Sequence, residues 1–232
     1  MSQSSLIHRE IVTSYPDLLP DLGIMCQSLY VIFHEPPSFA QLAMLDRFTL
    51  FKNYFAVRQN DYAQQNLEVL ADTCSEMDEH LLDALTADYQ QLFIGPENLS
   101  APPWGSVYLH PNKEIFDDST VEVDNFYRLH GLLLDTGMNE PADHIGLMFA
   151  FMAWLFSRDL DERYNSPSPS EWQKVTQKFV SNYVLTWSEH FLMLMHQNAA
   201  TLYYQKIAIL AQTIITDIAD YSGAVRKSAI IY

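Results

Sequence analysis

Apolar side chains recur every three or four residues along most of the chain, and this helical spacing limits the folds it can adopt. The longest stripe runs from Trp172 through Phe179 and Trp187 to Leu194. None of the stripes alternates between apolar and polar residues, as a half-buried strand would. Glycine is scarce, with 7 residues in 232, which disfavours folds that need many tight turns. The sequence therefore predicts an all-α protein.

We expect a bundle of about eight to ten helices in a single domain, residues 1–232. The predicted helices cover residues 22–34, 38–53, 61–73, 76–94, 119–136, 141–157, 170–196 and 200–220. Ser119–Glu122 and Ser168–Glu171 have the order of capping boxes, in which a serine oxygen and a glutamate satisfy free N–H groups of the first turn. Residues 145–156 are apolar on every side, so that helix should lie at the centre.

Two segments interrupt the helical pattern. The first, Gly95–Asp118, holds four prolines in 24 residues, too many for a helix. A segment this long without secondary structure is usually functional or disordered, and its aromatic residues favour an ordered loop. The second, residues 164–170, is rich in Asn, Ser and Pro and is predicted to be a hinge.

The charge of the chain is strongly negative, with 13 Lys and Arg against 29 Asp and Glu, a net of −16. This balance excludes binding to nucleic acid through phosphates and adhesion to anionic membrane surfaces. Residues 76–144 contain 14 acids and only two bases, so they carry −12 of the total. Such a stretch is either a solvated acidic face or the complement of a basic, partly apolar peptide.

Several other classes of protein are disfavoured. Cys26 and Cys74 are isolated, which indicates free thiols in a reducing compartment. The first 14 residues lack an apolar signal region, and the longest uncharged apolar run has 12 residues, short of the roughly 20 that span a membrane. We therefore expect a cytoplasmic protein without membrane insertion. The sequence contains no phosphate loop or cluster of metal ligands, so we expect neither a cofactor nor a metal.

Two polar or aromatic clusters are candidates for function. Residues 139–144 (Asn-Glu-Pro-Ala-Asp-His) precede the apolar helix and are either an ordinary helix start, with Pro141 in the first turn, or an acid–histidine group at the rim of a groove. Residues 102–109 place Trp104 and Tyr108 beside prolines and a glycine. These aromatics either form a protein-binding hot spot or pin the loop to the core.

These clusters carry a resemblance to a known family. The motifs, in order, are Tyr89-x-x-Leu92-Phe93-x-Gly95-Pro96, Pro102-Pro103-Trp104-Gly105-Ser106-Val107-Tyr108-Leu109 and Glu140-Pro141-x-Asp143-His144. Together they resemble the TorD/DmsD family, and the second motif is most similar to the DmsD branch. The resemblance implies an all-α, non-enzymatic cytoplasmic chaperone. Such a chaperone binds the twin-arginine leader of a molybdoenzyme precursor, of the DMSO or TMAO reductase type, until cofactor insertion and folding precede Tat export.

The resemblance also implies a binding site. Its residues are Tyr89, Leu92, Phe93, Pro103, Trp104, Gly105, Ser106, Tyr108, Glu140, Pro141, Asp143 and His144. The leader arginines would meet the carboxylates of Glu140 and Asp143, and its apolar stretch would pack on the aromatic residues. The chain departs from the family pattern at Glu97, His110 and Asp117.

Implied partners are the leader and body of the precursor, together with components of the Tat translocase. The chain would act as a monomer or a helix-exchanged dimer. Two other functions stay open. One is a generic helical scaffold for assembly of another exported or multi-subunit protein. The other is a hydrolase that uses Asp143, His144 and Glu140, although no nucleophile motif accompanies them.

Overall fold

The computed structural model describes residues 18–232, apart from residues 45–51, 53, 57, 77, 95–98, 113, 116, 134–139 and 166–169. Ten α-helices and two π-helical segments lie in this part of the chain: α1 (Leu19–His34), α2 (Phe39–Met44), α4 (Asp61–Ser75), α5 (Glu79–Tyr89), π-helical Gln90–Ile94, α6 (Ser106–Leu109), α7 (Asp118–Leu129), α8 (Ile145–Asn165), α9 (Glu171–Phe179), π-helical Val180–Val184, α10 (Ser188–Asn198) and α11 (Leu202–Ser222). The described residues contain no strand, only one isolated bridge. The prediction of an all-α fold is confirmed.

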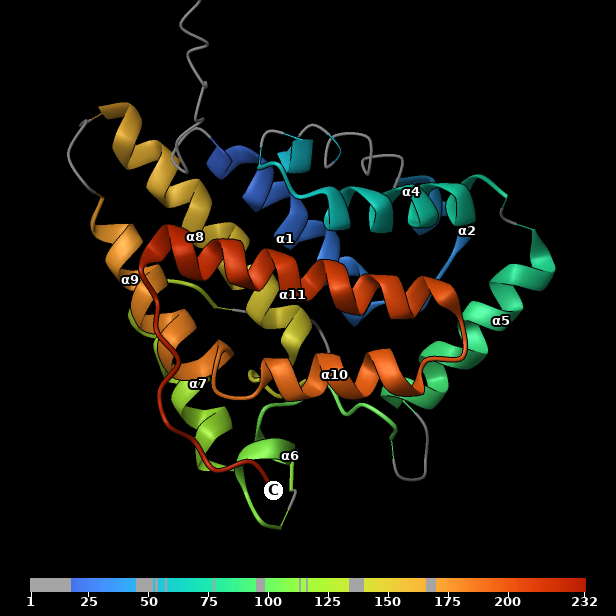
Figure 1. Cartoon of the computed structure of the whole chain (residues 1–232). Coiled ribbons are helices and arrows are strands. Elements are labelled where there is room, and N and C mark those ends of the chain that lie inside the picture. Colours follow the sequence, from blue (N-terminus) through green and yellow to red (C-terminus); the bar gives the residue numbers. More distant parts are fainter. Residues whose placement is uncertain are drawn as a thin grey trace, which may run out of the picture.

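Most of the first half of helix α8 is buried, as the apolar residues 145–156 predict. It packs along α1 and against α9, while α11 packs on α10 and α4 (Figure 1). Phe149 and Phe151 of α8 are fully buried, and the ring of Phe149 stacks on Phe33 of α1 at 5.9 Å. Among the described residues, no helix is long and apolar enough to cross a membrane.

The predicted capping boxes are replaced by other caps. The N-cap residue of α7 is Asp117, not Ser119. The backbone of Asp117 is extended (φ −93°, ψ 179°), and its carboxylate accepts the Asp118 N–H. Ser170 caps α9 by accepting the Trp172 N–H at 3.0 Å. The predicted cap at residues 168–169, the N-terminal residues 1–14 and half of the predicted helix over 38–53 lie outside the described residues. Residues 39–44 of that predicted helix form α2.

The prediction of one helix over residues 170–196 is wrong. A π-helical segment, Val180–Val184, follows α9, and the chain then turns before α10 begins. Trp187 leaves the helical region (φ −138°, ψ −24°), and its indole N–H donates to the Tyr183 carbonyl at 2.8 Å. Its fully buried ring stacks on Tyr108 at 5.5 Å. Trp187 fits the helical spacing of its neighbours, so the sequence gives no sign of a break there. The break depends on the packing of its ring against Tyr108, which is distant in the chain.

Other helix boundaries also differ from the predicted ones. Helix α7, predicted over residues 119–136, ends at Leu129 and is followed by a turn at His130 and Gly131. The segment predicted to be free of helix contains the single turn of α6, because its prolines flank residues 106–109 instead of interrupting them. Helix α8 begins at Ile145, not at residue 141, and continues to Asn165. The interpretation of residues 139–144 as an ordinary helix start therefore fails: the described residues 141–144 form a turn and a bridge.

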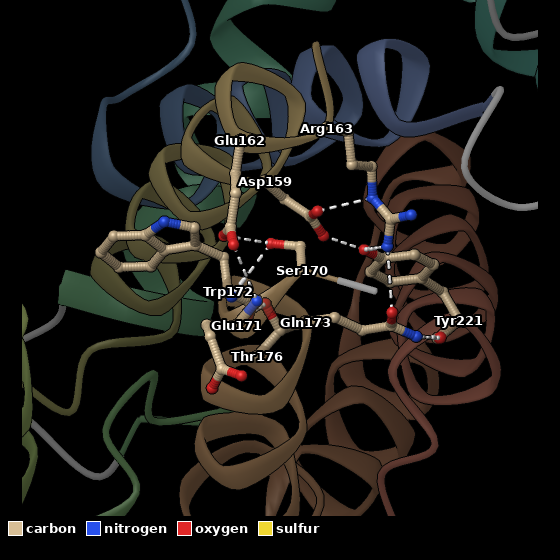
Figure 2. Close-up of polar contacts among 9 residues, drawn as sticks. All are labelled: Asp159, Glu162, Arg163, Ser170, Glu171, Trp172, Gln173, Thr176 and Tyr221. Carbon is tan, nitrogen blue, oxygen red and sulfur yellow. Dashed lines mark hydrogen bonds and ion pairs between the residues drawn. The ribbon is translucent and has the colours of Figure 1, made fainter. Parts of the chain in front are cut away.

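A polar network joins α8, α9 and α11 beside the predicted hinge (Figure 2). Arg163 donates to the buried carboxylate of Asp159 at 2.6 Å, and the Tyr221 hydroxyl donates to the other oxygen. Ser170 donates to Glu162 at 2.7 Å, so the start of α9 is tied to the end of α8. These contacts hold together the helices on both sides of the hinge segment, of which residues 166–169 are not described.

Candidate functional site

The second and third motifs meet in space along their backbones. Trp104 and His144 form an antiparallel bridge. Gly105 donates its N–H to the Asp143 carbonyl at 3.2 Å, and Ile145 donates to the Pro103 carbonyl at 2.8 Å. The first turn of α8 thus continues into a short extended pairing with residues 102–109, which we call the aromatic loop. This pairing fixes the loop against α8.

Asp143 anchors this junction from inside. Its side chain is buried, with one oxygen accepting the Ser106 N–H at 2.6 Å and the other accepting the Thr120 hydroxyl at 3.0 Å. A buried carboxylate with both oxygens engaged supports the start of α6 and the first turn of α7. It does not lie on the groove wall described below.

Five other predicted site residues also lie behind the surface: Leu92, Pro103, Gly105, Ser106 and Pro141. Gly105 lies so close to Trp187 that a Cβ atom would come within 2.7 Å of the indole nitrogen, so only glycine fits without displacement. Leu92 is fully buried, and its carbonyl accepts the Ala101 N–H at 3.2 Å. These residues shape the loop rather than face a ligand.

The remaining six predicted residues line one groove of about 950 Å³, and these are Tyr89, Phe93, Trp104, Tyr108, Glu140 and His144. The rest of the wall consists of residues outside the predicted site, and these are His34, Pro36, Ile94, Leu99, Ser100, Pro102, Val107, Ile115, His190, Leu194 and Tyr232. Some adjoin the predicted motifs and could have been found by extending them. His34, His190 and Tyr232 lie far away in the chain, and no local signal marks them.

Aromatic rings form much of the groove wall and are held in place by hydrogen bonds. The Tyr108 hydroxyl donates to the Pro102 carbonyl at 2.8 Å, and the Tyr89 hydroxyl donates to the Phe33 carbonyl at 3.2 Å. Rings whose polar atoms are already satisfied present apolar faces at a small entropic cost. The wall therefore suits an apolar ligand segment.

The rim of the groove is acidic. Trp104 is half-buried, and its indole N–H donates to Glu140 at 2.8 Å, so the aromatic ring and the carboxylate are presented together. Burial raises the pKa of Tyr89, and the negative charges of Glu140 and Glu35 raise it further. Both carboxylates thus act on the same region of the groove. A cationic group would be attracted there.

His144 is a neutral part of the wall. Burial lowers its pKa to about 3, and the neighbouring His34 adds to the effect. Its Nδ1 accepts the Gly146 N–H at 3.1 Å, and its ring meets Trp104 edge to face at 5.8 Å. The described hydrogen bonds of the Asp143 carboxylate go to Ser106 and Thr120, and none of them joins it to this ring. Within the described residues, no group of His, Cys, Asp and Glu could hold a metal ion.

Comparison with known proteins gives the family. The family profile described as "Nitrate reductase delta subunit" matches residues 59–193. A relative from Haemophilus influenzae named "Probable Tat proofreading chaperone DmsD" is 32% identical, over 83% of this chain and 87% of its own. The chain belongs to the TorD/DmsD family.

Other members of the TorD/DmsD family are more distant. The "Tat proofreading chaperone DmsD" of Salmonella typhimurium is 28% identical over 83% of this chain and 86% of its own. The "Chaperone protein TorD" of Vibrio atlanticus is 25% identical over 54% and 58%. The matched region 59–193 contains both chain segments that meet at the aromatic loop, whereas His34, Pro36, Leu194 and Tyr232 lie outside it.

Proposed function

We propose that this protein is a non-catalytic cytoplasmic chaperone that binds the twin-arginine leader of a molybdoenzyme precursor in the groove. The precursor would be of the DMSO or TMAO reductase type, and binding would last until cofactor insertion and folding precede Tat export. The observation that carries the proposal is the backbone pairing of the aromatic loop with residues 143–145. Together with Glu140, the paired segments contribute to an apolar groove with an acidic rim. The names of the family relatives support it.

The geometry divides the ligand's contacts into two parts. The apolar stretch of the leader would pack on the rings of Phe93, Trp104 and Tyr108, which line the groove. The arginines would meet Glu140 at the rim, with the exposed Glu35 nearby in the same field. The motif resemblance predicts that Asp143 also meets the arginines. Its buried position instead favours a positioning role for it.

Nothing in this arrangement requires chemistry on the ligand. Ser106 is the aliphatic hydroxyl residue within the second motif, but it is fully buried, and its N–H is committed to Asp143. We therefore propose no catalytic residue, no metal and no cofactor for the site. The chain would act as one domain, as a monomer or a helix-exchanged dimer, with the precursor body and Tat translocase components as further partners.

The first test measures binding of a fluorescent twin-arginine leader peptide to Glu140→Gln. Glutamine keeps the oxygen that accepts the Trp104 N–H and removes only the charge. We expect affinity to fall about fivefold to tenfold. The matched control is Glu122→Gln, an exposed change of the same charge on α7, away from the groove. Equal affinities for both variants would contradict the role of Glu140.

The second test removes the aromatic anchor. Trp104→Ala should weaken the same peptide about tenfold or more, because buried aromatic anchors dominate peptide interfaces. Trp154→Ala serves as the control, since Trp154 is a half-buried ring on α8 that does not line the groove. Unaltered binding by Trp104→Ala, or an equal loss in Trp154→Ala, would show that the peptide binds elsewhere.

A further inference from the structure

Residues 224–232 follow α11 and return across the molecule to the groove. Gly223 ends α11 in the left-handed region (φ 72°), and the Ala224 N–H donates to the Ala219 carbonyl at 2.9 Å. The segment then runs past α9 and ends beside α6 (Figure 1). Its last residue, Tyr232, belongs to the groove wall. We call residues 224–232 the strap.

The start of the strap is firmly held. The side-chain amide of Gln173 donates to the Tyr221 carbonyl at 2.8 Å, within the network that joins α8, α9 and α11 (Figure 2). Gln177 donates to the Gly223 carbonyl at 2.7 Å, and the Val225 N–H donates to the Ser181 hydroxyl at 3.0 Å. The point at which the chain leaves α11 is therefore fixed in place and direction.

The far end of the strap is joined to the aromatic loop. Tyr232 donates its N–H to the Tyr108 carbonyl at 3.1 Å, and the Tyr108 ring is stacked on Trp187. Ile231 is half-buried and packs against the core. One backbone hydrogen bond and two side chains therefore place the strap on one end of the groove.

Between these ends the strap makes few contacts. Arg226 pairs with Glu189 at 2.8 Å and donates to the Thr186 carbonyl at 3.4 Å, but the Arg226 and Glu189 side chains are both exposed. Lys227, Ser228 and Ile230 are also exposed, and Ile230 retains 69% of its accessible surface. Segments with little buried apolar area and exposed ion pairs open readily. The strap can therefore leave the groove without unfolding the helices.

The order of chemical groups in the strap matches that of the proposed ligand. Two adjacent cations, Arg226 and Lys227, precede the apolar residues Ala229, Ile230 and Ile231. A twin-arginine leader presents two adjacent cations and an apolar stretch in the same way. We propose that the strap occupies one end of the groove in the free protein and is displaced by the leader, so that it lowers the affinity for leaders. This inference rests on the proposed function.

The test weakens both holding points of the strap in the full chain. The variant Arg226→Ala/Tyr232→Pro removes the ion pair with Glu189 and the N–H that donates to Tyr108. Because the competing strap is released, the leader peptide should bind about threefold to tenfold more tightly. Glu189→Gln breaks the same ion pair from α10 and should shift affinity in the same direction. Lys174→Ala is the matched control, because it removes one exposed cation on α9, outside both the strap and the groove, and should leave affinity unchanged.

Weaker binding by the double variant would mean that the strap is part of the leader's own contact surface, and unchanged binding would mean that it does not compete. Either result overturns the inference. Hydrogen exchange gives a readout that needs no leader. In the free protein, the Tyr232 amide should exchange more slowly than the Ile230 amide, whose N–H has no acceptor within the described part of the chain. Equal exchange rates at the two amides would contradict the hydrogen bond between Tyr232 and Tyr108, and with it the seating of the strap on the groove.

Adding the leader should accelerate exchange at Tyr232, and slower exchange would contradict displacement. If wild type and all variants fail to bind the leader, the proposed function fails, and with it the competition. A slowly exchanging Tyr232 amide that Arg226→Ala accelerates would still support a strap seated on the groove. The two proposals can therefore fail separately.

Discussion

At the scale of single residues, the site separates groups that face the groove from groups that hold it in shape. Glu140 and Trp104 are partly exposed at the rim, whereas Asp143 is buried three residues after Glu140. The motif contains both kinds of residue in one short run. Their roles differ because the turn over residues 141–144 points one carboxylate outward and the other into the loop.

His144 predicts a pH-dependent stability. Its pKa in the folded protein is lowered to about 3 from an ordinary 6.5, so between these values the unfolded chain binds a proton that the folded chain does not. Stability contributed by neutral His144 should be present above pH 6.5 and be lost as the pH falls. Between pH 7 and pH 5 the loss should be about 2 kcal/mol.

The measurement is urea unfolding at pH 7 and pH 5. His144→Gln should flatten the dependence, because glutamine does not titrate, while the exposed control His80→Gln should keep the wild-type slope. A steep pH dependence that persists in His144→Gln would show that other groups cause it.

At the scale of elements, the site depends on short pieces held by long helices. Helix α6 is a single turn and is too short to be stable alone. Its position comes from Asp143 before α8, from Thr120 in α7 and from Trp187 between α9 and α10. The aromatic loop is therefore ordered by tertiary contacts from three helical regions.

Asp143→Asn tests this coupling between elements. The amide can still accept one hydrogen bond, but it loses the charge-assisted bonds to the Ser106 N–H and the Thr120 hydroxyl. We expect a loss of about 2 kcal/mol in the free energy of unfolding. Near-ultraviolet circular dichroism should also change, because Trp104 lies in the loop.

The control is Asp124→Asn, in which an exposed ion pair with Arg128 is lost. That change should leave the free energy of unfolding close to the wild-type value, because solvent screens an exposed pair. If Asp143→Asn keeps full stability and loses only leader binding, then Asp143 contacts the ligand directly and the positioning role is wrong.

At the scale of the whole molecule, charge and shape act together. The chain carries a net charge of −16, and its groove has apolar walls and an acidic rim. Long-range attraction should guide a basic leader to the protein, and the aromatic rings should determine how long it remains bound.

Raising the salt concentration should therefore weaken leader binding, mainly through a slower association rate. Between about 50 mM and 500 mM NaCl we expect an affinity loss of roughly threefold to tenfold, since screening shortens the reach of charge interactions. Stopped-flow mixing separates the two rates. Glu140→Gln should show a shallower salt dependence, and an association rate insensitive to salt would contradict electrostatic guidance.

The amino-acid sequence by itself determined the helical class, the burial of residues 145–156, the acidic stretch and the motifs of the family. These properties follow from local periodicity and composition, which a single chain segment carries. Only the tertiary structure decided which motif residues reach the groove. Tyr89 and Trp104 line the groove, whereas Leu92 and Gly105 do not. Which side of the chain faces the groove depends on tertiary contacts, such as those of Tyr89 with Phe33 and of Gly105 with Trp187. It likewise brought His34 and Tyr232, 198 positions apart, to the same groove wall, a proximity that arises only when distant helices pack.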